Sequence, residues 1–298
     1  MGSNDSKTAV IIPTHGRPDL VYTERSLRRS GYTGDIYLLC DDEDELLGEY
    51  RKRYGDKVIV FSKDDYAGRF DKMDNFGNKA CVVYARNAIW DAAKSLGLRY
   101  FVVADDDYFA FEYRTTESGG YYAKNIRNLD DVFGAYIAFL QSTKVSTICF
   151  AQGGDYIGGA ENNNVRSGFK HSRKMMNLYF FAVDRPLEFK GTINEDLTSS
   201  ITEGVIGKVI ISSFMNSITQ SATQSNMGGL TEIYLELGTY VKSFYSVMAA
   251  PSCVKVAEMG NTSSRLHHRV SWRHAVPKIV SEGLRAQAEQ SSKVASDV

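Results

Sequence analysis

Short apolar runs alternate with amphipathic stretches through the first half of the chain. Each run has four or five consecutive apolar residues bounded by polar or turn-forming residues, which is typical of strands buried on both faces. Strands of this kind, connected by helices, form a largely parallel sheet covered by helices. The pattern therefore predicts an α/β fold. The predicted strands lie at 8–14, 35–41, 57–62, 100–105 and 146–152.

Two of the connecting stretches place apolar residues at helical spacing. From Ala85 to Leu96 the apolar positions fall on one helical face, and Gly97 follows where a helix is expected to end. The same spacing recurs from Leu129 to Leu140. Both patterns predict helices that pack against the sheet.

The amino-acid composition of the chain changes after residue 151. A stretch rich in Gly and Asn (152–164) leads into a basic stretch (165–177), and an apolar run at 178–184 predicts another strand. Acidic residues at 195 and 196 open a predicted helix. Beyond Gly204 the apolar residues lose a regular period, and we expect strands only at 232–241 and 250–259. The polar stretch 281–298 predicts a tail.

Composition narrows the functional classes. The 298 residues are 43% apolar, and 35 basic against 36 acidic residues give a net charge of −1. Contact with nucleic acid would therefore need a local basic patch. The four cysteines are widely separated and lack CxxC spacing, which favours reduced thiols. No apolar run approaches the roughly 18 residues of a membrane span. We predict a cytoplasmic protein that does not contact the membrane.

Candidate catalytic and binding residues lie where the predicted strands end, which is where ligands bind in open parallel sheets. The strand at 100–105 runs into Asp105, Asp106 and Asp107, whose mutual repulsion a cation would relieve. Hard cations such as Mg²⁺ or Mn²⁺ prefer carboxylate oxygens. Alternate residues at a strand end point the same way, so Asp105 and Asp107 are natural partners. A solvated acidic turn remains the alternative.

Other strand ends carry polar side chains as well. The first ends in a turn with Thr14, His15 and Arg17, which lacks the GxGxxG of a dinucleotide site, and the second ends at Asp41 and Asp42.

These features, in this order, resemble the GT-A class of nucleotide-sugar glycosyltransferases. The resemblance is carried by IIPTHGRP, ARNAIWD, the DxD-like Asp105 to Asp107, the acidic INEDLTSS and the late SRLHHRVSW. It implies a GT-A, Rossmann-like domain over 1–280, with a donor-binding half (1–150), an acceptor-binding half (151–280) and a tail at 281–298. The implied donor is a nucleotide-sugar, most simply a UDP-sugar, held with Mn²⁺ or Mg²⁺.

The resemblance also implies roles for individual residues. Asp196, or Glu195, would be the general base, although acidic residues also simply stabilise helix N-termini. Arg86, Lys79 or Arg269 could share the charge of the diphosphate. The implied donor contacts are Thr14, His15, Arg17, Asp41, Asp42, Arg86, Asn87, Asp105 and Asp106, and the implied metal ligands are Asp105, Asp107, and His267 or His268.

Within that class the chain is similar to the TET-associated glycosyltransferases, found largely in bacteriophages. That group is thought to glycosylate hydroxymethylated pyrimidines in DNA, so the implied partner is DNA and the implied location is the host cytoplasm. A basic segment beside the Gly/Asn stretch could contact phosphates, and Tyr156 and Phe169 could stack on an extruded base. A mobile solvated loop is the alternative. The candidate acceptor contacts are Arg166, Lys170, Arg173 and Lys174.

Several other functions remain open. A sugar-phosphate nucleotidyltransferase has a related architecture, but its Gly-rich phosphate loop is not evident after the first strand. A binding protein without catalysis on the same fold, or a glycosyltransferase acting on a protein or glycan, would show similar patterns. A HAD-type phosphatase fits less well, because ADDDYF lacks that class's usual DxDx(T/V).

Overall fold

The computed structural model describes residues 7–75, 77, 79–117, 120–220, 238, 240–259 and 265–284. Four strands of its N-terminal part pair in parallel in the order β3-β2-β1-β4. Each lies within a stretch that the apolar runs predict, so these strands are confirmed. Their bounds are β1 (Thr8–Pro13), β2 (Asp35–Asp41), β3 (Val58–Phe61) and β4 (Tyr100–Val103).

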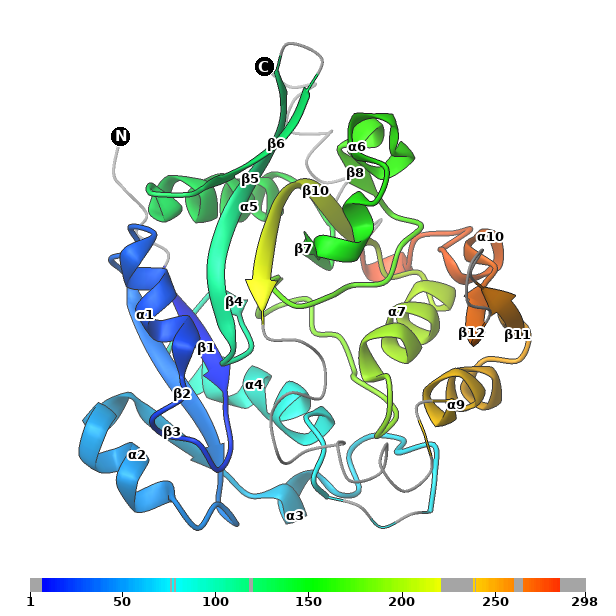
Figure 1. Cartoon of the computed structure of the whole chain (residues 1–298). Helices are drawn as coiled ribbons and strands as arrows, with labels where there is room; N and C mark the ends of the chain where they lie inside the picture. Colours follow the sequence, from blue (N-terminus) through cyan, green and yellow to red (C-terminus); the bar gives the residue numbers. More distant parts are fainter. Residues whose placement is uncertain are drawn as a thin grey trace, which may run out of the picture.

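The sheet continues beyond β4 with strands from both halves of the sequence. The remaining strands are β5 (Tyr108–Glu117), β6 (Gly120–Asn125), β7 (Thr147–Gln152), β8 (Phe169–Lys170), β9 (Tyr179–Ala182) and β10 (Ile210–Gln220). Within the described residues, ten strands form one sheet in the order β3-β2-β1-β4-β9-β7-β10-β5-β6, with β8 paired to β10. β9 and β5 run antiparallel to their neighbours, and β7 and β10 pair in parallel. The β5–β6 hairpin projects past the helices (Figure 1).

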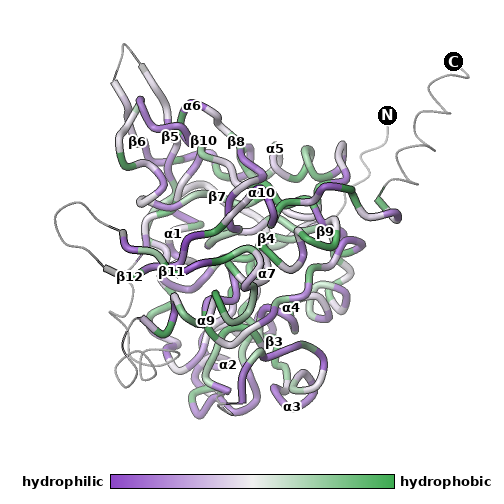
Figure 2. Tube along the Cα trace, turned by 90° about the vertical axis from the view of Figure 1, so that its right-hand side faces the viewer, coloured by the Kyte–Doolittle hydropathy of each residue, from purple (hydrophilic) through white to green (hydrophobic). Residues whose placement is uncertain are grey.

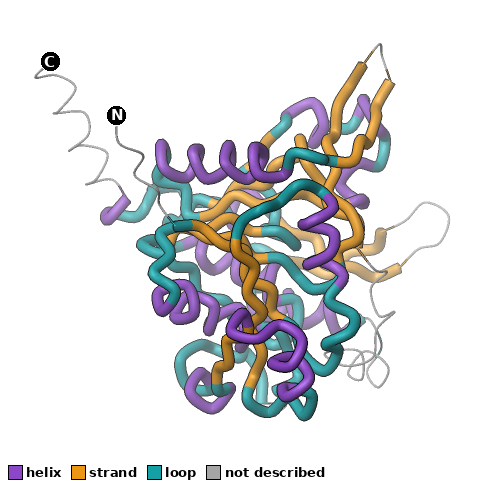
Figure 3. Tube along the Cα trace, turned by 90° about the vertical axis from the view of Figure 1, so that its left-hand side faces the viewer, coloured by secondary structure: helices purple, strands orange, loops and turns teal. Residues whose placement is uncertain are grey.

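Helices cover both faces of this sheet (Figure 3). Alternation along β1 sends Val10 and Ile12 into a core that includes side chains of α1 (Tyr22–Arg29) and α5 (Leu129–Ser142). Ala9 and Ile11 join a core on the opposite face, which α4 (Val83–Ser95) covers. The predicted α/β class is thus confirmed, and α4 and α5 match the predicted helices. The helices are α1 (Tyr22–Arg29), α2 (Leu47–Tyr54), α3 (Lys63–Tyr66), α4 (Val83–Ser95), α5 (Leu129–Ser142) and α6 (Asn163–Ser167), with short 3₁₀ turns η1 (Gly55–Lys57), η2 (Gly153–Tyr156) and η3 (Gly159–Glu161).

β10 was not predicted, because its interior positions are small and polar. Ser213 and Asn216 are buried, and both contact the hydroxyl of Tyr136, at 2.6 and 2.8 Å. Ser217 is also buried and is bonded to Arg114 at 2.7 Å. These hydrogen bonds satisfy the buried hydroxyls of Ser213 and Ser217 and the amide oxygen of Asn216, although Nδ2 of Asn216 has no partner among the described residues, so the strand lies in the sheet without an apolar period.

The C-terminal part of the described chain forms a small unit against α7 (Glu195–Val205). It contains α9 (Val241–Ala249), the antiparallel pair β11 (Val254–Met259) and β12 (Arg265–Val270), and α10 (Trp272–Ala275). Figure 2 views the molecule from this side. Leu197 and Ile201 of α7 pack with Ala250, Val254 and Ala275. The C-terminal unit therefore supports the helix that begins at Glu195.

Two sequence predictions fall in this unit. β11 confirms the strand expected at 250–259. The strand expected at 232–241 lies largely outside the described residues, and its last residue, Val241, begins α9 instead. In the part of the chain that the structure describes, no helix is long and apolar enough to cross a membrane. The division into a donor half and an acceptor half stays a prediction, as does the tail, of which only 281–284 is described.

Phe181 provides a test of the core. It is 1% exposed and its ring lies 4.8 Å from that of Trp90 and 5.5 Å from that of Phe101. We expect Phe181→Ala to lower the free energy of unfolding by about 3–5 kcal/mol, because it leaves a cavity. Phe244→Ala, at a position 53% exposed, should change it by less than about 0.5 kcal/mol. Urea unfolding measures both, and equal effects would contradict this account of the core.

Candidate functional site

The parallel strands bring their polar ends to one edge of the sheet. β1 pairs with both β2 and β4, so the turn after β1, Asp41 at the end of β2, and the aspartates after β4 meet there. Direct contacts confirm the convergence. Thr14 donates a hydrogen bond to Asp106 at 2.6 Å, and the ring nitrogen Nδ1 of His15 lies 2.7 Å from Asp41.

Asp106 holds the first turn to the aspartate triplet. Its buried carboxylate accepts from the Thr14 hydroxyl and, at 2.7 Å, from Nε of Arg17. The hydroxyl of Tyr50 contacts Thr14 at 2.9 Å and accepts from the backbone N–H of Arg17 at 3.0 Å. Three of the predicted donor contacts are therefore tied to one another. Asp106 accepts both bonds on one oxygen, Oδ2, and through them it holds the turn in position.

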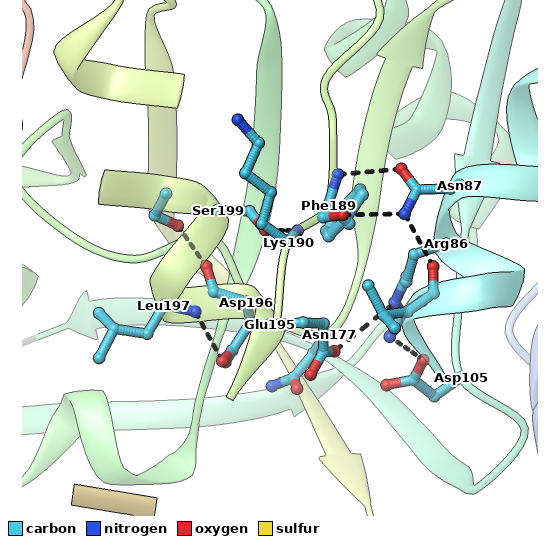
Figure 4. A network of polar contacts seen from close by, with 12 residues as sticks. Arg86, Asn87, Asp105, Asn177, Phe189, Lys190, Glu195, Asp196, Leu197 and Ser199 are labelled. Carbon is cyan, nitrogen blue, oxygen red and sulfur yellow. Dashed lines mark hydrogen bonds and ion pairs between the residues drawn. The ribbon is translucent and has the colours of Figure 1, made fainter. Parts of the chain in front are cut away.

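Asp105 points instead toward Arg86 of α4. The carboxylate accepts a hydrogen bond from Nη2 of Arg86, and the hydroxyl of Tyr108 lies 3.4 Å from it (Figure 4). The Arg86 side chain is 4% exposed and lies over the ring of Tyr179, with Cζ 5.0 Å from its centroid. Burying the guanidinium costs desolvation free energy, and the attraction of the neighbouring carboxylates offsets that cost.

Arg86 also faces Glu195 at the start of α7. Its Nε lies 4.0 Å from Oε1 of Glu195. Nε and Nη1 are buried and have no hydrogen-bond partner among the described residues. One guanidinium thus sits between two carboxylates from distant parts of the sequence, with donor capacity left over.

A cavity of about 240 Å³ lies beside this guanidinium. It collects carboxylates, cations and amides from β4, β9, α4, α7 and α9. Its lining residues are Arg86, Asp105, Asn177, Tyr179, Asn194, Glu195, Asp196 and Lys242. Four of these, Asn177, Tyr179, Asn194 and Lys242, were missed as site residues in the sequence.

Asn177 and Asn194 share a backbone conformation that the sequence does not indicate. Both have left-handed backbones, with φ of 63° and 59°. Such residues are uncommon and concentrate at functional sites, although Asn tolerates the conformation better than most. The amide of Asn194 donates to the hydroxyl of Ser246 at 2.6 Å, and that of Asn177 to Gln152 at 3.0 Å.

The two acidic residues of α7 have different environments. Asp196 pairs with Nζ of Lys174 at 2.6 Å and accepts the N–H of Leu197 at 2.7 Å. Burial opposes ionisation of Asp196, but the Lys174 ammonium prevails and lowers its pKa. For Glu195, burial, followed by the charge of Asp196, raises the pKa to about 7, and Arg86 only partly offsets this. Asp196 is therefore a fixed anion, while Glu195 can exchange a proton near neutral pH.

His268 is partly buried and lies within electrostatic range of Lys174 and Asp196. Burial and the nearby charges of His267 and Lys174 lower the pKa of His268 to about 4, and Asp196 acts in the opposite direction. Its Nδ1 is buried and has no hydrogen-bond partner among the described residues. Nδ1 of His267 instead lies 3.0 Å from the backbone carbonyl of His268. A neutral imidazole with an unused nitrogen favours His268 over His267 as a candidate ligand.

The carboxylates of this region are suitable ligands for a divalent metal ion, but they are not arranged around a common point. In the described ranges no group of three or more His, Cys, Asp or Glu side chains is placed to hold an ion. Burial, together with Asp105 and Asp106, raises the pKa of Asp107 to about 7, which is the repulsion that a divalent cation relieves. Asp107 is not among the residues that line the 240 Å³ cavity. Its role as a metal ligand stays a prediction.

The end of β2 forms a separate charged group. Lys63 lies 2.8 Å from Asp41 on the side opposite His15. Although burial opposes it, hydrogen bonds from His15 and Lys63 lower the pKa of Asp41 to about 2, and the bond to Asp41 raises the pKa of His15. Asp42 is exposed and lies outside this group. Lys79 pairs with Asp64 and Glu43 at 2.5 and 3.1 Å, away from the cavity.

A larger cavity of about 840 Å³ opens beside the first turn, between that turn and α2. Arg17 lies on its wall, and the remaining lining residues are Gly16, Pro18, Asp19, Leu20, Leu46, Glu49, Lys52 and Arg53. We place the chemistry at the smaller cavity, because the larger one contains no strand-end carboxylate.

The side-chain amide of Asn87 forms its hydrogen bonds with backbone groups. Its amide donates to the carbonyls of Val83 and Phe189, at 3.0 and 2.9 Å, and accepts the N–H of Phe189 at 3.0 Å (Figure 4). The side chain clamps the segment before α7 to α4. A direct donor contact would have to replace these bonds.

The basic segment is only partly available to a partner. Arg173 pairs with the buried Asp155, Arg166 with Glu161, and Lys174 with Asp196. Nζ of Lys170 contacts the neutral Asn164 at 2.8 Å. Stacking on a base by Tyr156 was a wrong prediction, because this ring is buried against Phe214 and its hydroxyl donates to the carbonyl of Asn216 at 3.0 Å.

Known proteins were compared with the chain at the level of sequence and structure. A family model described as TET-Associated Glycosyltransferase matches residues 8–229. No curated protein matches. Among solved structures, glucosyl-3-phosphoglycerate synthase from Mycobacterium tuberculosis, in complex with Mg²⁺ and UDP, is 9% identical with a TM-score of 0.43, covering 89% of this chain and 88% of that one.

Two further structures are similar at the same low level. S. aureus TarS is 13% identical with a TM-score of 0.40, covering 72% of this chain and 37% of that one. A cytidylyltransferase from Leptospira borgpetersenii is 12% identical with a TM-score of 0.33, covering 60% and 61%. Likenesses this weak do not decide between functions.

The aspartate triplet gives a stability test. An unfolded Asp has a pKa near 4, so the raised pKa of Asp107 means that its ionisation opposes folding, increasingly from about pH 4 to 7 and fully above pH 7. In EDTA at pH 8, Asp107→Ala should therefore be at least as stable as the unchanged protein. Asp106→Ala should lose about 1–3 kcal/mol, because Thr14 and Arg17 lose their buried acceptor. Urea unfolding at pH 5 and pH 8 measures both, and a clear loss for Asp107→Ala at pH 8 would refute the repulsion.

Proposed function

Since the chain belongs to the TET-associated glycosyltransferase family and is a glycosyltransferase, we propose that it transfers a sugar from a UDP-sugar to the hydroxyl of a hydroxymethylated pyrimidine in DNA. One observation carries the site assignment. Asp105 at the end of β4 and Glu195 at the start of α7 face one cavity across a buried Arg86. This arrangement supports a donor side and a base side around one reaction centre.

Residues at the ends of β1, β2 and β4 would bind the donor. Asp105 and Asp107, with His268 as a further ligand, have the donor atoms that Mn²⁺ or Mg²⁺ accepts. When bound, the metal would neutralise the charge on the diphosphate as the nucleotide leaves. Arg86 supplies a second, permanent positive charge on the wall of the cavity. The turn containing His15, fixed to Asp41, would contact the nucleoside.

Glu195 is the better candidate for the general base, whereas the sequence had favoured Asp196. A base must be free to take a proton, and Asp196 is held by Lys174 and the Leu197 N–H. Glu195 has its nearest cation, Arg86, 4.0 Å away and a pKa close to the working pH. Glu195 would remove the proton from the acceptor hydroxyl as its oxygen attacks the anomeric carbon. Asp196 would hold Lys174 at the rim of the cavity.

The segment from Gly153 to Lys174 supports DNA as the acceptor. It has four Lys or Arg residues against two acidic ones, while the whole chain is slightly negative. Its last residue reaches the catalytic carboxylates, because Lys174 pairs with Asp196. Phosphate contacts along this segment would lead an acceptor strand to the cavity.

Replacing each of the two carboxylates by its amide tests which of them is the general base. We expect Glu195→Gln to lower kcat by about 10²–10⁴-fold with donor affinity unchanged, because only proton removal is lost. With Glu195 intact, kcat/KM should fall below about pH 7, where Glu195 becomes protonated. The residual activity of Glu195→Gln should not show this decrease at low pH. Asp196→Asn is the matched variant. If it lost more kcat than Glu195→Gln with unchanged donor affinity by calorimetry, Asp196 would be the base.

Product analysis tests the reaction and the acceptor together. We expect incubation with Mn²⁺, UDP-sugars and DNA containing hydroxymethylated pyrimidine to add a hexose-sized mass to that nucleoside and to release UDP. EDTA and Asp105→Ala should each abolish transfer. Unmodified DNA and a panel of other sugar nucleotides are the controls. Release of pyrophosphate would indicate a nucleotidyltransferase, and transfer to a protein or glycan but not to DNA would refute the acceptor.

A further inference from the structure

The side-chain amide of Asn177 is held in one orientation. The side-chain oxygen of Gln152 accepts the backbone N–H of Asp155 in the capping box of η2, so the atom of Gln152 that faces Asn177 is an acceptor. Asn177 therefore turns its Nδ2 toward Gln152, at 3.0 Å. Gln152 is not among the residues that line the 240 Å³ cavity, whereas Asn177 is (Figure 4). Oδ1 of Asn177, which has no hydrogen-bond partner among the described residues, is left as an acceptor on the cavity wall.

A similar count of donors and acceptors fixes the amide of Asn194. The hydroxyl of Ser246 donates its only hydrogen to the carbonyl of Lys242 at 3.1 Å, so it accepts from Nδ2 of Asn194, at 2.6 Å. Oδ1 of Asn194 is buried and has no hydrogen-bond partner in the part of the chain that the structure describes. Its partial negative charge is therefore not compensated, and it adds to the negative potential on this side of the cavity.

The wall of the cavity is rich in acceptors and poor in apolar groups. Its charged lining residues are the carboxylates Asp105, Glu195 and Asp196 and the cations Arg86 and Lys242. None of the lining residues is Ala, Val, Leu, Ile, Met or Phe. The ring of Tyr179 is 1% exposed and lies beneath the guanidinium of Arg86. Ligand hydroxyls that donate hydrogen bonds suit such a wall, whereas a methyl group finds no apolar surface on it.

The position of Asn177 places its acceptor beside the donor side of the cavity. The hydroxyl of Tyr108 donates to the backbone carbonyl of Asn177 and lies 3.4 Å from Asp105. The cavity volume of about 240 Å³ is below the roughly 300–1,000 Å³ of pockets that enclose drug-sized ligands, so it fits one monosaccharide ring and not a whole sugar nucleotide. In the proposed reaction this ring is the transferred sugar, because it lies between Asp105 and Glu195.

We propose that the cavity selects an unsubstituted neutral hexose as the transferred sugar, with Oδ1 of Asn177 accepting a hydrogen bond from one of its hydroxyls. This inference rests on the proposed function and adds the class of sugar to it. An N-acetyl group would bring a methyl group to a wall without aliphatic residues. A uronic acid would bring a further carboxylate to a wall that already has three against two cations. Both substituted sugars should therefore bind less well than glucose or galactose.

Calorimetry in the presence of Mn²⁺ and without DNA tests the selection. The ligands are UDP, UDP-glucose, UDP-galactose, UDP-N-acetylglucosamine and UDP-glucuronate. We expect the better of the two neutral hexose donors to bind at least about tenfold more tightly than either substituted donor, which is the effect of about one hydrogen bond. Equal or tighter binding of UDP-N-acetylglucosamine or UDP-glucuronate would overturn the proposal.

Asn177→Gly tests the residue, because glycine adopts the left-handed backbone, with φ of 63°, without strain. We expect the affinity for the preferred hexose donor to fall about tenfold. The affinities for UDP, which has no sugar, and for UDP-N-acetylglucosamine should not change, so the preference among donors narrows. Asn125→Gly, at an exposed position of β6, is the matched control and should bind every ligand as the unchanged protein does.

Other outcomes contradict the role of Asn177. If Asn177→Gly weakened UDP and the hexose donor equally, the side chain would support the fold of the site and would not contact the sugar. Urea unfolding checks that the variant is folded. Should it not fold, the comparison of donors with the unchanged protein still decides whether the cavity selects a neutral hexose.

Transfer to hydroxymethylated DNA, measured separately, distinguishes this inference from the proposed function. Preference for a neutral hexose donor without transfer to DNA would support the inference and refute the DNA acceptor. Preferred transfer of N-acetylglucosamine or glucuronate to that DNA would support the proposed function and overturn the inference. Failure to bind any of the UDP-sugars would overturn both.

Discussion

A buried guanidinium between two carboxylates is the interaction on which the site depends. Arg86 bonds to Asp105 and faces Glu195, and it lies over the ring of Tyr179, away from water. Removing one partner of a buried ion pair typically costs about 3–5 kcal/mol, because the remaining charge is left uncompensated. Without Arg86, the carboxylates of Asp105 and Glu195 would repel each other across the cavity. The guanidinium thus permits both to line one small volume.

The same cation links two parts of the fold. Arg86 is on α4, Asp105 follows β4, and Glu195 begins α7, which the C-terminal unit supports from its far side. The family match ends at residue 229, yet Lys242 from α9 lines the cavity and His268 from β12 lies near Asp196. The C-terminal unit therefore completes the electrostatics of the site as well as its packing.

Local patterns in the sequence identified most of the residues whose roles follow from where a strand or helix ends. Asp105 was found in this way, because a charged residue at the end of an apolar run is a local signal, whereas Arg86 and Glu195 were identified by the resemblance of ARNAIWD and INEDLTSS to motifs of a known family. Asn177 and Lys242 were missed, since their place at the cavity depends on tertiary packing and, for Asn177, on a left-handed backbone that no short pattern encodes. β10 was missed because its buried serines and asparagine interrupt the apolar period.

The aspartate triplet shows how far a sequence motif alone can be misleading about individual side chains. Three identical neighbours have three environments: Asp105 faces Arg86 and the cavity, and Asp106 accepts hydrogen bonds from Thr14 and Arg17. Asp107 is partly buried, and burial together with the other two carboxylates raises its pKa. β4 ends at Val103, and Asp106 and Asp107 lie in the turn that follows, so neighbours of the same residue type have different surroundings and different roles. A turn used only for solubility would expose all three carboxylates to water. Asp106 is buried instead, and burial together with the neighbouring carboxylates raises the pKa of Asp107, so the acidic groups at this sheet edge are held close together rather than dispersed in water.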